Sequence, residues 1–160
     1  MPATMVGMIS PSTIESPSIE PTPAPAVALA PLPHLKIGNV DIGFPVVQAA
    51  LSGYSDMAMR VIARRLGASY SLCEVVLDQV ILQAGKKLKR RYLQVDPGEH
   101  PVAGQLMGSD PTEFAAAALE LVAAGFDVID INFGCPVKKV ALGQSAGSAL
   151  MRDEIAAARI

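Results

Sequence analysis

From His34 onward, short apolar runs alternate along the chain with longer stretches in which apolar and polar residues follow a helical period. This alternation is typical of consecutive βα units, in which each strand of a parallel sheet is followed by a helix that covers it. We count four such units. The strands are predicted at 44–50, 70–76, 102–107 and 128–132, and the helices at 56–66, 78–89, 113–124 and from 147 onward.

Local signals mark several helix ends. Ser55 or Asp56 is placed to cap the free N–H groups of the first helix, and Gly67 follows its last residue. Pro111 suits the first turn of the third helix, and Gly125 is placed to end it. The elements therefore predict the α/β class with a parallel sheet.

Residues 1–33 have a different composition. They hold eight of the chain's 13 prolines, interleaved with Ser, Thr and Ala. Because proline removes backbone donors, this stretch is expected to be a disordered leader, and the folded part is expected over 34–160. The Ala-rich helix predicted at the end has no stop signal before Ile160, which suggests that the natural chain continues.

Length and composition limit the possibilities. The 160 residues are well short of the roughly 250 typical of a closed (β/α)₈ barrel, although 51% hydrophobic residues suffice for a buried core. Two cysteines, Cys73 and Cys135, are too few for a disulfide scaffold, so a cytoplasmic location is expected. The sequence shows neither a secretory signal nor a membrane-spanning run, and its His and Cys residues lack metal-ligand spacing. We therefore expect no membrane and no metal partner.

In a parallel βα array, ligands bind beyond the carboxyl ends of the strands. Three unusual features are expected there: 49–53 after the first strand, Gln105 in the third, and 132–136 after the fourth. Small residues such as Ala49 and Ala50 let a flat ring approach the backbone, and the Gln105 amide can both donate to and accept from a heterocycle. These features suit a flavin or a nucleobase.

The turn after the fourth strand carries a candidate reactive group. Cys135 lies between Gly134 and Pro136, on a constrained turn where its thiol could transfer a proton or attack a carbon. Lys139 supplies a positive charge nearby. Taken alone, such a turn is more often structural than catalytic. Cys73 has apolar neighbours, which favours a buried core residue.

Three further features are open to two interpretations each. Glu74 either faces the site from the second strand or lies on the surface. The basic run 86–91 either binds RNA phosphates or forms a solvated helix end. Arg60 either reaches a phosphate or makes a surface ion pair.

Four segments occur in order along the chain: AALSGYSD at 49–56, QLMG at 105–108, DINFGCPVKKV at 130–140 and GSALMRD at 147–153. Together they resemble the signature of the tRNA-dihydrouridine synthases. The resemblance covers about residues 38–160, and the segment 130–140 is highly specific. At the first motif the family usually has Ala-Pro-Met, where this chain has Ala50 and Leu51.

The resemblance implies a (β/α)₈ TIM-barrel type of α/β fold, of which this chain holds about the first four units, followed by a small helical RNA-binding domain. In that family an FMN cofactor, reduced by NADPH or NADH, passes a hydride to C6 of a uracil in tRNA. Cys135 then matches the general acid that protonates C5, and Asn132 and Lys139 match substrate-binding positions. The flavin-contacting positions match Ala49, Ala50, Leu51 and Gln105.

Two alternatives stay open. Another FMN-barrel oxidoreductase, acting on a free pyrimidine or an enone, needs the same flavin and acid, although the intact residues 138–140 after Cys135 favour the tRNA enzymes. The second alternative is an inactive fragment or an RNA-binding remnant, because half a parallel barrel leaves exposed sheet edges.

Overall fold

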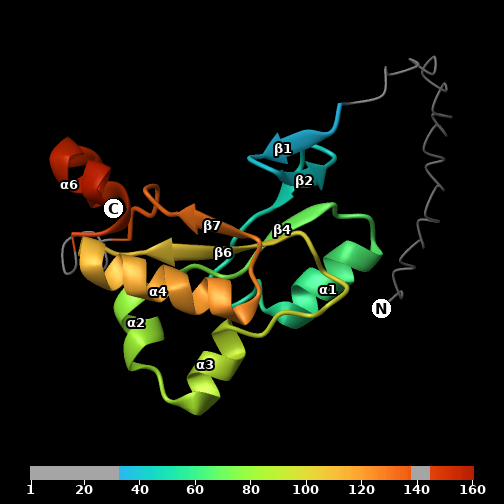
Figure 1. The fold of residues 1–160 in the computed structure, drawn as a ribbon, viewed down its shortest axis with the longest axis horizontal. Helices are drawn as coiled ribbons and strands as arrows, with labels where there is room; N and C mark the ends of the chain where they lie inside the picture. Colours follow the sequence, from blue (N-terminus) through green and yellow to red (C-terminus); the bar gives the residue numbers. More distant parts are fainter. Residues whose placement is uncertain (1–32, 138–144) are drawn as a thin grey trace, which may run out of the picture. The chain divides into compact units, whose positions relative to one another are not determined.

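A short antiparallel hairpin opens the part of the chain that the computed structural model describes, which is residues 33–137 and 145–160 (Figure 1). Its strands are β1 (Leu35–Ile37) and β2 (Val40–Gly43), joined by a turn in which Gly38 has a φ of +57°. Glycine reaches this left-handed conformation without a steric penalty. The sequence pattern predicts no strand here, because strands of three and four residues are too short to show an apolar period.

Within the described residues, five strands form one parallel sheet, as the βα alternation predicts (Figure 1). They are β3 (Val47–Gln48), β4 (Tyr70–Leu72), β5 (Val76–Leu77), β6 (Val102–Met107) and β7 (Val128–Ile131). β7 pairs with one edge of β6, β4 and β5 pair with the other, and β3 lies beyond β4. Neighbours in space are therefore neighbours in the chain, which is consistent with part of a TIM-barrel type of sheet.

The second predicted strand, 70–76, is interrupted in the structure. Ser71 of β4 pairs with Val102 of β6, and Val76 of β5 pairs with Leu106. Between these two pairs the segment with β4 and β5 has one residue more than β6. Such an extra residue is a β-bulge. At the bulge the Glu74 N–H leaves the ladder and donates to the Ser55 carbonyl oxygen at 3.1 Å.

Helices follow the strands, and several begin and end at the predicted signals. They are α1 (Met57–Arg65), α2 (Asp78–Gln83), α3 (Lys86–Tyr92), α4 (Pro111–Ala124), the 3₁₀ helix η1 (Gly147–Arg152) and α6 (Glu154–Arg159). Asp56 caps α1 by accepting the Met59 N–H at 2.9 Å, which decides between the two predicted caps. Asp110 caps α4, and Gly125 ends it with a φ of +102°.

Two predicted elements are shorter than expected. The helix predicted at 78–89 is divided, because Ala84 and Gly85 are extended between α2 and α3. The first predicted strand, 44–50, contributes only the two residues of β3 to the sheet.

The last helix also begins later than predicted. The prediction placed its start near Gly147, where the structure has the 3₁₀ helix η1. The backbone at Asp153 is not helical and separates η1 from α6. The Asp153 side chain caps α6 by accepting the Ala156 N–H at 2.9 Å. The α-helix therefore begins at Glu154.

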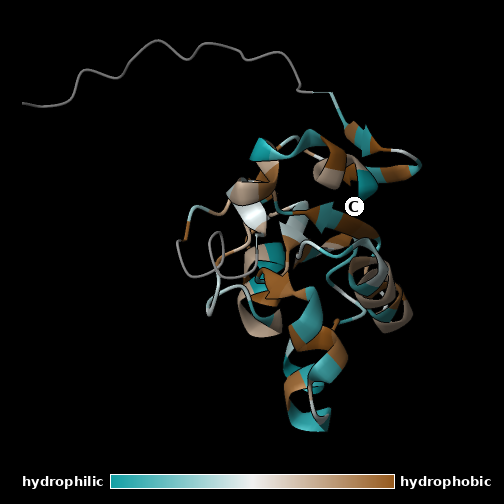
Figure 2. Cartoon of the chain, turned by 90° about the vertical axis from the view of Figure 1, so that its left-hand side faces the viewer, coloured by the Kyte–Doolittle hydropathy of each residue, from teal (hydrophilic) through white to brown (hydrophobic). Residues whose placement is uncertain are grey.

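β6 is buried on both faces of the sheet. The cluster on the helix side includes Val102, Leu106, Phe114, Ala117 and Leu121. The cluster on the opposite side consists of Ile42, Tyr70, Leu72 and Ala103. Burial of a large apolar side chain stabilises a fold by about 1.5–3 kcal/mol. Figure 2 shows both hydrophobic and hydrophilic residues along the helices.

The described helices include none with the length and apolar character needed to cross a membrane. The predicted leader, apart from residue 33, and the predicted substrate-binding residue Lys139 lie outside the described residues.

Candidate functional site

Gln105 and Asn132 lie side by side at the carboxyl end of the sheet. Side chains alternate between the two faces of a strand, so Gln105 shares with Ala103 the face of β6 that points away from α4. Asp130 is the register partner of Gln105 on β7, and Asn132 follows two residues later. Polar side chains therefore follow the apolar cluster toward the strand ends.

A chain of hydrogen bonds joins these side chains to the Cys135 turn. Gln105 Nε2 donates to Asp130 Oδ2 at 2.6 Å, and Gln105 Oε1 accepts from Asn132 Nδ2 at 2.9 Å. Asn132 Oδ1 in turn accepts the backbone N–H groups of Gly134 at 3.0 Å and Cys135 at 2.9 Å. Three predicted site residues, Gln105, Asn132 and Cys135, are thus brought together.

The two backbone donors fix how both amides are turned. Because Asn132 Oδ1 accepts two N–H groups, its Nδ2 faces Gln105, which must accept there and donate to Asp130. Each amide nitrogen carries two N–H groups, so within the described residues one on Gln105 and one on Asn132 remain for a ligand. The sequence pattern did not single out Asp130, although its position two residues before Asn132 on one strand face was an available signal.

The start of η1 packs against the Cys135 turn. The Ser148 N–H donates to the Cys135 carbonyl oxygen at 3.0 Å. Gly147 has a φ of +61°, and a Cβ built there would lie 2.8 Å from that oxygen and 3.1 Å from the Cys135 Cβ. Only glycine fits this approach, which is a physical reason for the glycine that begins GSALMRD. Cys135 itself is half-buried.

Ser55 organises the loop 49–55 after β3. Its buried hydroxyl accepts the Leu51 N–H at 2.7 Å and donates to the Ala49 carbonyl oxygen at 3.1 Å. Ala50 packs against the cluster opposite the helices, whereas Leu51 is 48% exposed. Three of the four predicted flavin-contacting residues, Ala49, Ala50 and Leu51, therefore lie on this loop, and the edge strand β3 before it is separated by β4 from β6, which carries the fourth, Gln105. A helix-cap pattern alone does not predict this role for Ser55.

Glu74 is buried at the bulge between β4 and β5, so the interpretation as a surface residue is wrong. Its Oε2 accepts the Gly53 N–H at 2.5 Å, and its Oε1 lies 3.4 Å from Nε of Arg91 on α3. Glu74 therefore joins the loop 49–55 to the basic helix α3.

Arg60 makes neither of the two predicted contacts. It forms a buried ion pair with Glu99, with the two side chains 2% and 1% exposed. Nε donates to Glu99 Oε2 at 2.8 Å and Nη2 to Oε1 at 3.0 Å. Nη1 donates to the Ser55 carbonyl oxygen at 3.0 Å. Arg60 thus supports the loop 49–55 from inside the protein.

Cys73 is a core residue, as predicted. Burial raises the pKa of its thiol to about 11, so the thiol is protonated near neutral pH and is a poor nucleophile. In the part of the chain that the structure describes, no group of three or more His, Cys, Asp or Glu residues could hold a metal ion.

Comparison with known proteins gives a consistent result. A family model described as "Dihydrouridine synthase (Dus)" matches residues 47–160. A probable tRNA-dihydrouridine synthase of Rickettsia conorii is 38% identical over 127 residues, which is 79% of this chain and 38% of the relative. A tRNA-dihydrouridine synthase B of Pseudomonas aeruginosa is 38% identical over 126 residues, 79% of this chain and 37% of the relative. The chain thus spans less than two fifths of the length of these curated relatives.

Proposed function

The chain belongs to the dihydrouridine synthase family, and on that premise we propose that it forms part of an enzyme that reduces uridine in tRNA to 5,6-dihydrouridine. The parallel sheet then supplies the first strands of a (β/α)₈ barrel. The observation that carries the proposal is the hydrogen-bonded chain from Asp130 through Gln105 and Asn132 to the Cys135 turn. It gathers amide donors and a thiol at the carboxyl ends of two adjacent strands, where barrel enzymes bind substrates.

The residues at these strand ends fit a flat heterocyclic cofactor such as FMN. In its contacts with the described residues Gln105 leaves one N–H and one lone pair unused, and Ala49 and Ala50 leave room for a ring beside the backbone. Gln48 Oε1, buried at the end of β3, has no hydrogen-bond partner among the described residues and can accept from such a ring. We propose that Ala49, Ala50, Leu51 and Gln105 hold the flavin. When bound and reduced by NADPH or NADH, it supplies the hydride for uracil C6.

Cys135 then donates the proton that uracil C5 needs. Its backbone N–H is bonded to Asn132 Oδ1, so the turn that carries the thiol is held beside the Asn132 amide. The unused Asn132 N–H can donate to a uracil carbonyl oxygen and orient the ring toward the thiol. We propose Lys139 as a further contact to the RNA. A uracil must leave its stack before these groups can reach it.

The test is to replace Cys135 by Ala in the full-length protein and to measure dihydrouridine in digested tRNA by mass spectrometry. We expect a loss of about 10²- to 10⁴-fold in rate, the usual contribution of a positioned acid, with the visible flavin absorption retained. Cys73→Ala is the matched control, because that thiol is buried in the core and should affect stability rather than turnover. Wild-type turnover in the Cys135→Ala variant would exclude the acid role. A flavin-loaded wild-type protein that leaves tRNA unreduced would exclude the function.

A further inference from the structure

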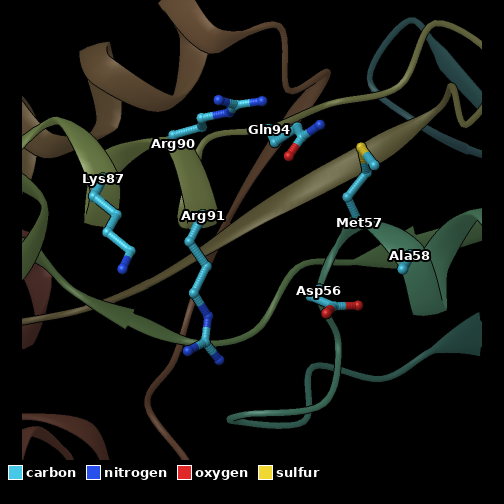
Figure 3. Close-up of a pocket in the computed structure, with 7 residues that line it drawn as sticks. All are labelled: Asp56, Met57, Ala58, Lys87, Arg90, Arg91 and Gln94. Atoms are coloured by element: carbon cyan, nitrogen blue, oxygen red, sulfur yellow. The ribbon is translucent and has the colours of Figure 1, made fainter.

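A hollow of about 320 Å³ lies between α3 and the first turn of α1 (Figure 3). Lys87, Arg90 and Arg91 of α3 lie on one side of it, and residues 56–58 lie on the other. The three basic residues are spaced i, i+3 and i+4, so one face of the helix presents all of them. The hollow is therefore lined on one side by three cations.

Most of this charge is not neutralised within the described residues. Arg91 is 3.4 Å from the Glu74 carboxylate, but its side chain is still 53% exposed. Lys87 and Arg90 have no ion-pair partner in the described part of the chain. Lys89, which does not line the hollow, pairs instead with Glu120. The one carboxylate in the lining, Asp56, is already engaged by the Met59 N–H as the cap of α1.

Packing does not explain why the cations are gathered here. None of the residues of α3 is buried, and Tyr92, which packs partly buried against the core, lies outside the lining of the hollow. Like charges at i and i+4 destabilise a helix by about 0.2–0.5 kcal/mol, which an anion shared between them would relieve. A phosphate suits this arrangement, because guanidinium and ammonium groups donate charge-assisted hydrogen bonds to its oxygens. The positive end of the α1 dipole adds to the attraction.

The lining favours a phosphate of the RNA backbone over a free nucleotide. It contains no aromatic residue on which a base could stack, which favours contacts to phosphate oxygens over contacts to a base. The hollow is also connected to the candidate site. The Glu74 carboxylate contacts Arg91 and accepts the Gly53 N–H of the loop 49–55. A strand held at the hollow would pass beside the loop to which we assign flavin contacts.

We propose that the hollow between α1 and α3 is a subsite that binds a backbone phosphate of the tRNA substrate through Lys87, Arg90 and Arg91. The inference rests on the proposed function for the identity of the RNA. It replaces the interpretation of the run 86–91 as a merely solvated helix end.

The test compares two double variants of the full-length protein that lose the same charge. Lys87→Ala/Arg90→Ala removes two cations from the hollow. Lys86→Ala/Arg65→Ala also removes one lysine and one arginine, both exposed, from outside the lining. Binding of fluorescently labelled, unmodified tRNA is followed by anisotropy at a series of salt concentrations, and thermal melting checks that each variant is folded.

We expect the hollow variant to bind tRNA about tenfold more weakly or worse, since hydrogen bonds to a charged group are lost. The slope of log affinity against log salt should also fall by about 1, as for the loss of one phosphate contact. The control variant should change both quantities less. Equal losses in the two variants would show that only net charge matters, and would overturn the proposal.

The assay separates this inference from the proposed function, because it measures binding and not reduction. Wild-type protein that binds tRNA with the expected difference between variants, but does not reduce it, supports the subsite and refutes the activity. Wild-type protein that does not bind tRNA overturns the subsite whatever activity is found. Displacement of the tRNA from the wild type, but not from the hollow variant, by low concentrations of inorganic phosphate would assign the hollow to a free anion and also overturn it.

Discussion

Asp78, the first residue of α2, is a buried carboxylate with an incomplete set of partners. Its Oδ1 accepts the Gln79 N–H at 2.7 Å, while its buried Oδ2 has no hydrogen-bond partner among the described residues. A Cβ on Gly108 would lie 1.8 Å from Oδ2, so only glycine leaves room for the carboxylate there. This contact is a physical reason for the glycine that ends the QLMG motif.

The environment of Asp78 makes the stability of the fold depend on pH. Burial raises the pKa of its carboxyl above the ordinary value of 3.8, and the carboxylates of Glu113 and Asp110 add to the effect, while the Gln79 N–H opposes it. Folded Asp78 thus binds its proton more tightly than the unfolded chain does. The resulting stability is present below pH 3.8 and is lost as the pH rises through the raised pKa.

We therefore expect Asp78→Asn to raise the melting temperature at neutral pH. At that pH the ionised carboxylate opposes folding, and a neutral amide of the same shape removes the charge. A gain of about 1 kcal/mol corresponds to a few degrees in Tm for a chain of this size. Thermal melts at several pH values check this, because the difference from the wild type should disappear below the ordinary pKa of an aspartate. A pH-independent difference, or a lower Tm at neutral pH, would contradict the argument.

At the scale of elements, the Arg60–Glu99 pair ties α1 to the loop that leads into β6. Besides its two bonds to the carboxylate, Arg60 donates to the carbonyl oxygens of Ser55 and, at 2.9 Å, Gln94. The attraction between the two buried charges offsets the large free-energy cost of removing them from water. If one partner is removed, the other stays buried without that compensation. The pair therefore fixes α1 against the loop before β6, while the bond from Arg60 to the Ser55 carbonyl oxygen holds the end of the loop 49–55.

We expect Arg60→Met to destabilise the fold by about 3–5 kcal/mol, and Arg60→Met/Glu99→Leu to cost much less than the two single changes added together. Urea denaturation of all four proteins in the double-mutant cycle measures this coupling. Lys89→Ala is the control, because the Lys89–Glu120 pair is 30% and 40% exposed and should contribute at most about 1 kcal/mol. An Arg60→Met variant no less stable than the Lys89→Ala variant would show that the buried pair is energetically unimportant.

Elements with strong local signals are the ones that the sequence predicts well. The limits of β6 agree with the predicted strand, and Asp110 and Gly125 bound α4 as their chemistry requires. The interrupted second strand was missed because its cause is the distant Ser55 carbonyl oxygen, which draws the Glu74 N–H out of the ladder. Local patterns carry no information about such a partner.

The same distinction applies to the candidate site. Gln105, Asn132 and Cys135 could be predicted, since motif and strand order place them at neighbouring strand ends. The positioning residues are harder to predict. The spacing of Asp130 from Asn132 was the available signal for it, but its bond to Gln105 depends on the register of β6 and β7. Ser55 holds the loop 49–55 through the geometry of a turn, which no local pattern shows. Their roles exist only in the folded chain.

At the scale of the whole molecule, the sheet ends in two edge strands within the described residues. β3 pairs only with β4 there, and β7 only with β6. Apolar side chains lie on both edges, with Val47 43% and Ile131 41% exposed. Unpaired strand edges are templates for association with another chain. The relatives are more than twice as long as this chain, and a closed barrel would cover both edges.

We therefore expect the isolated 160-residue chain to self-associate through its sheet edges. Val47→Lys should shift the population toward the monomer, because a charge on an edge strand opposes pairing. Ile37→Lys is the matched control, since Ile37 is similarly exposed, at 41%, but belongs to the separate hairpin. Size-exclusion chromatography with light scattering measures the masses. A monomeric wild-type chain, or an equal effect of both substitutions, would contradict edge pairing.

The visible spectrum of the same fractions connects the sheet edges to the site. The loop 49–55 follows the edge strand β3, and the Cys135 turn follows the edge strand β7. Both therefore depend on strands that have no neighbour on one side in the described part of the chain. We expect flavin absorption only where the sheet edges are paired. The wild-type oligomer should therefore show flavin bands, and the Val47→Lys monomer should lack them. Flavin bound to that monomer would mean that the strand ends of this sheet suffice for the cofactor, and that the rest of a barrel serves the RNA.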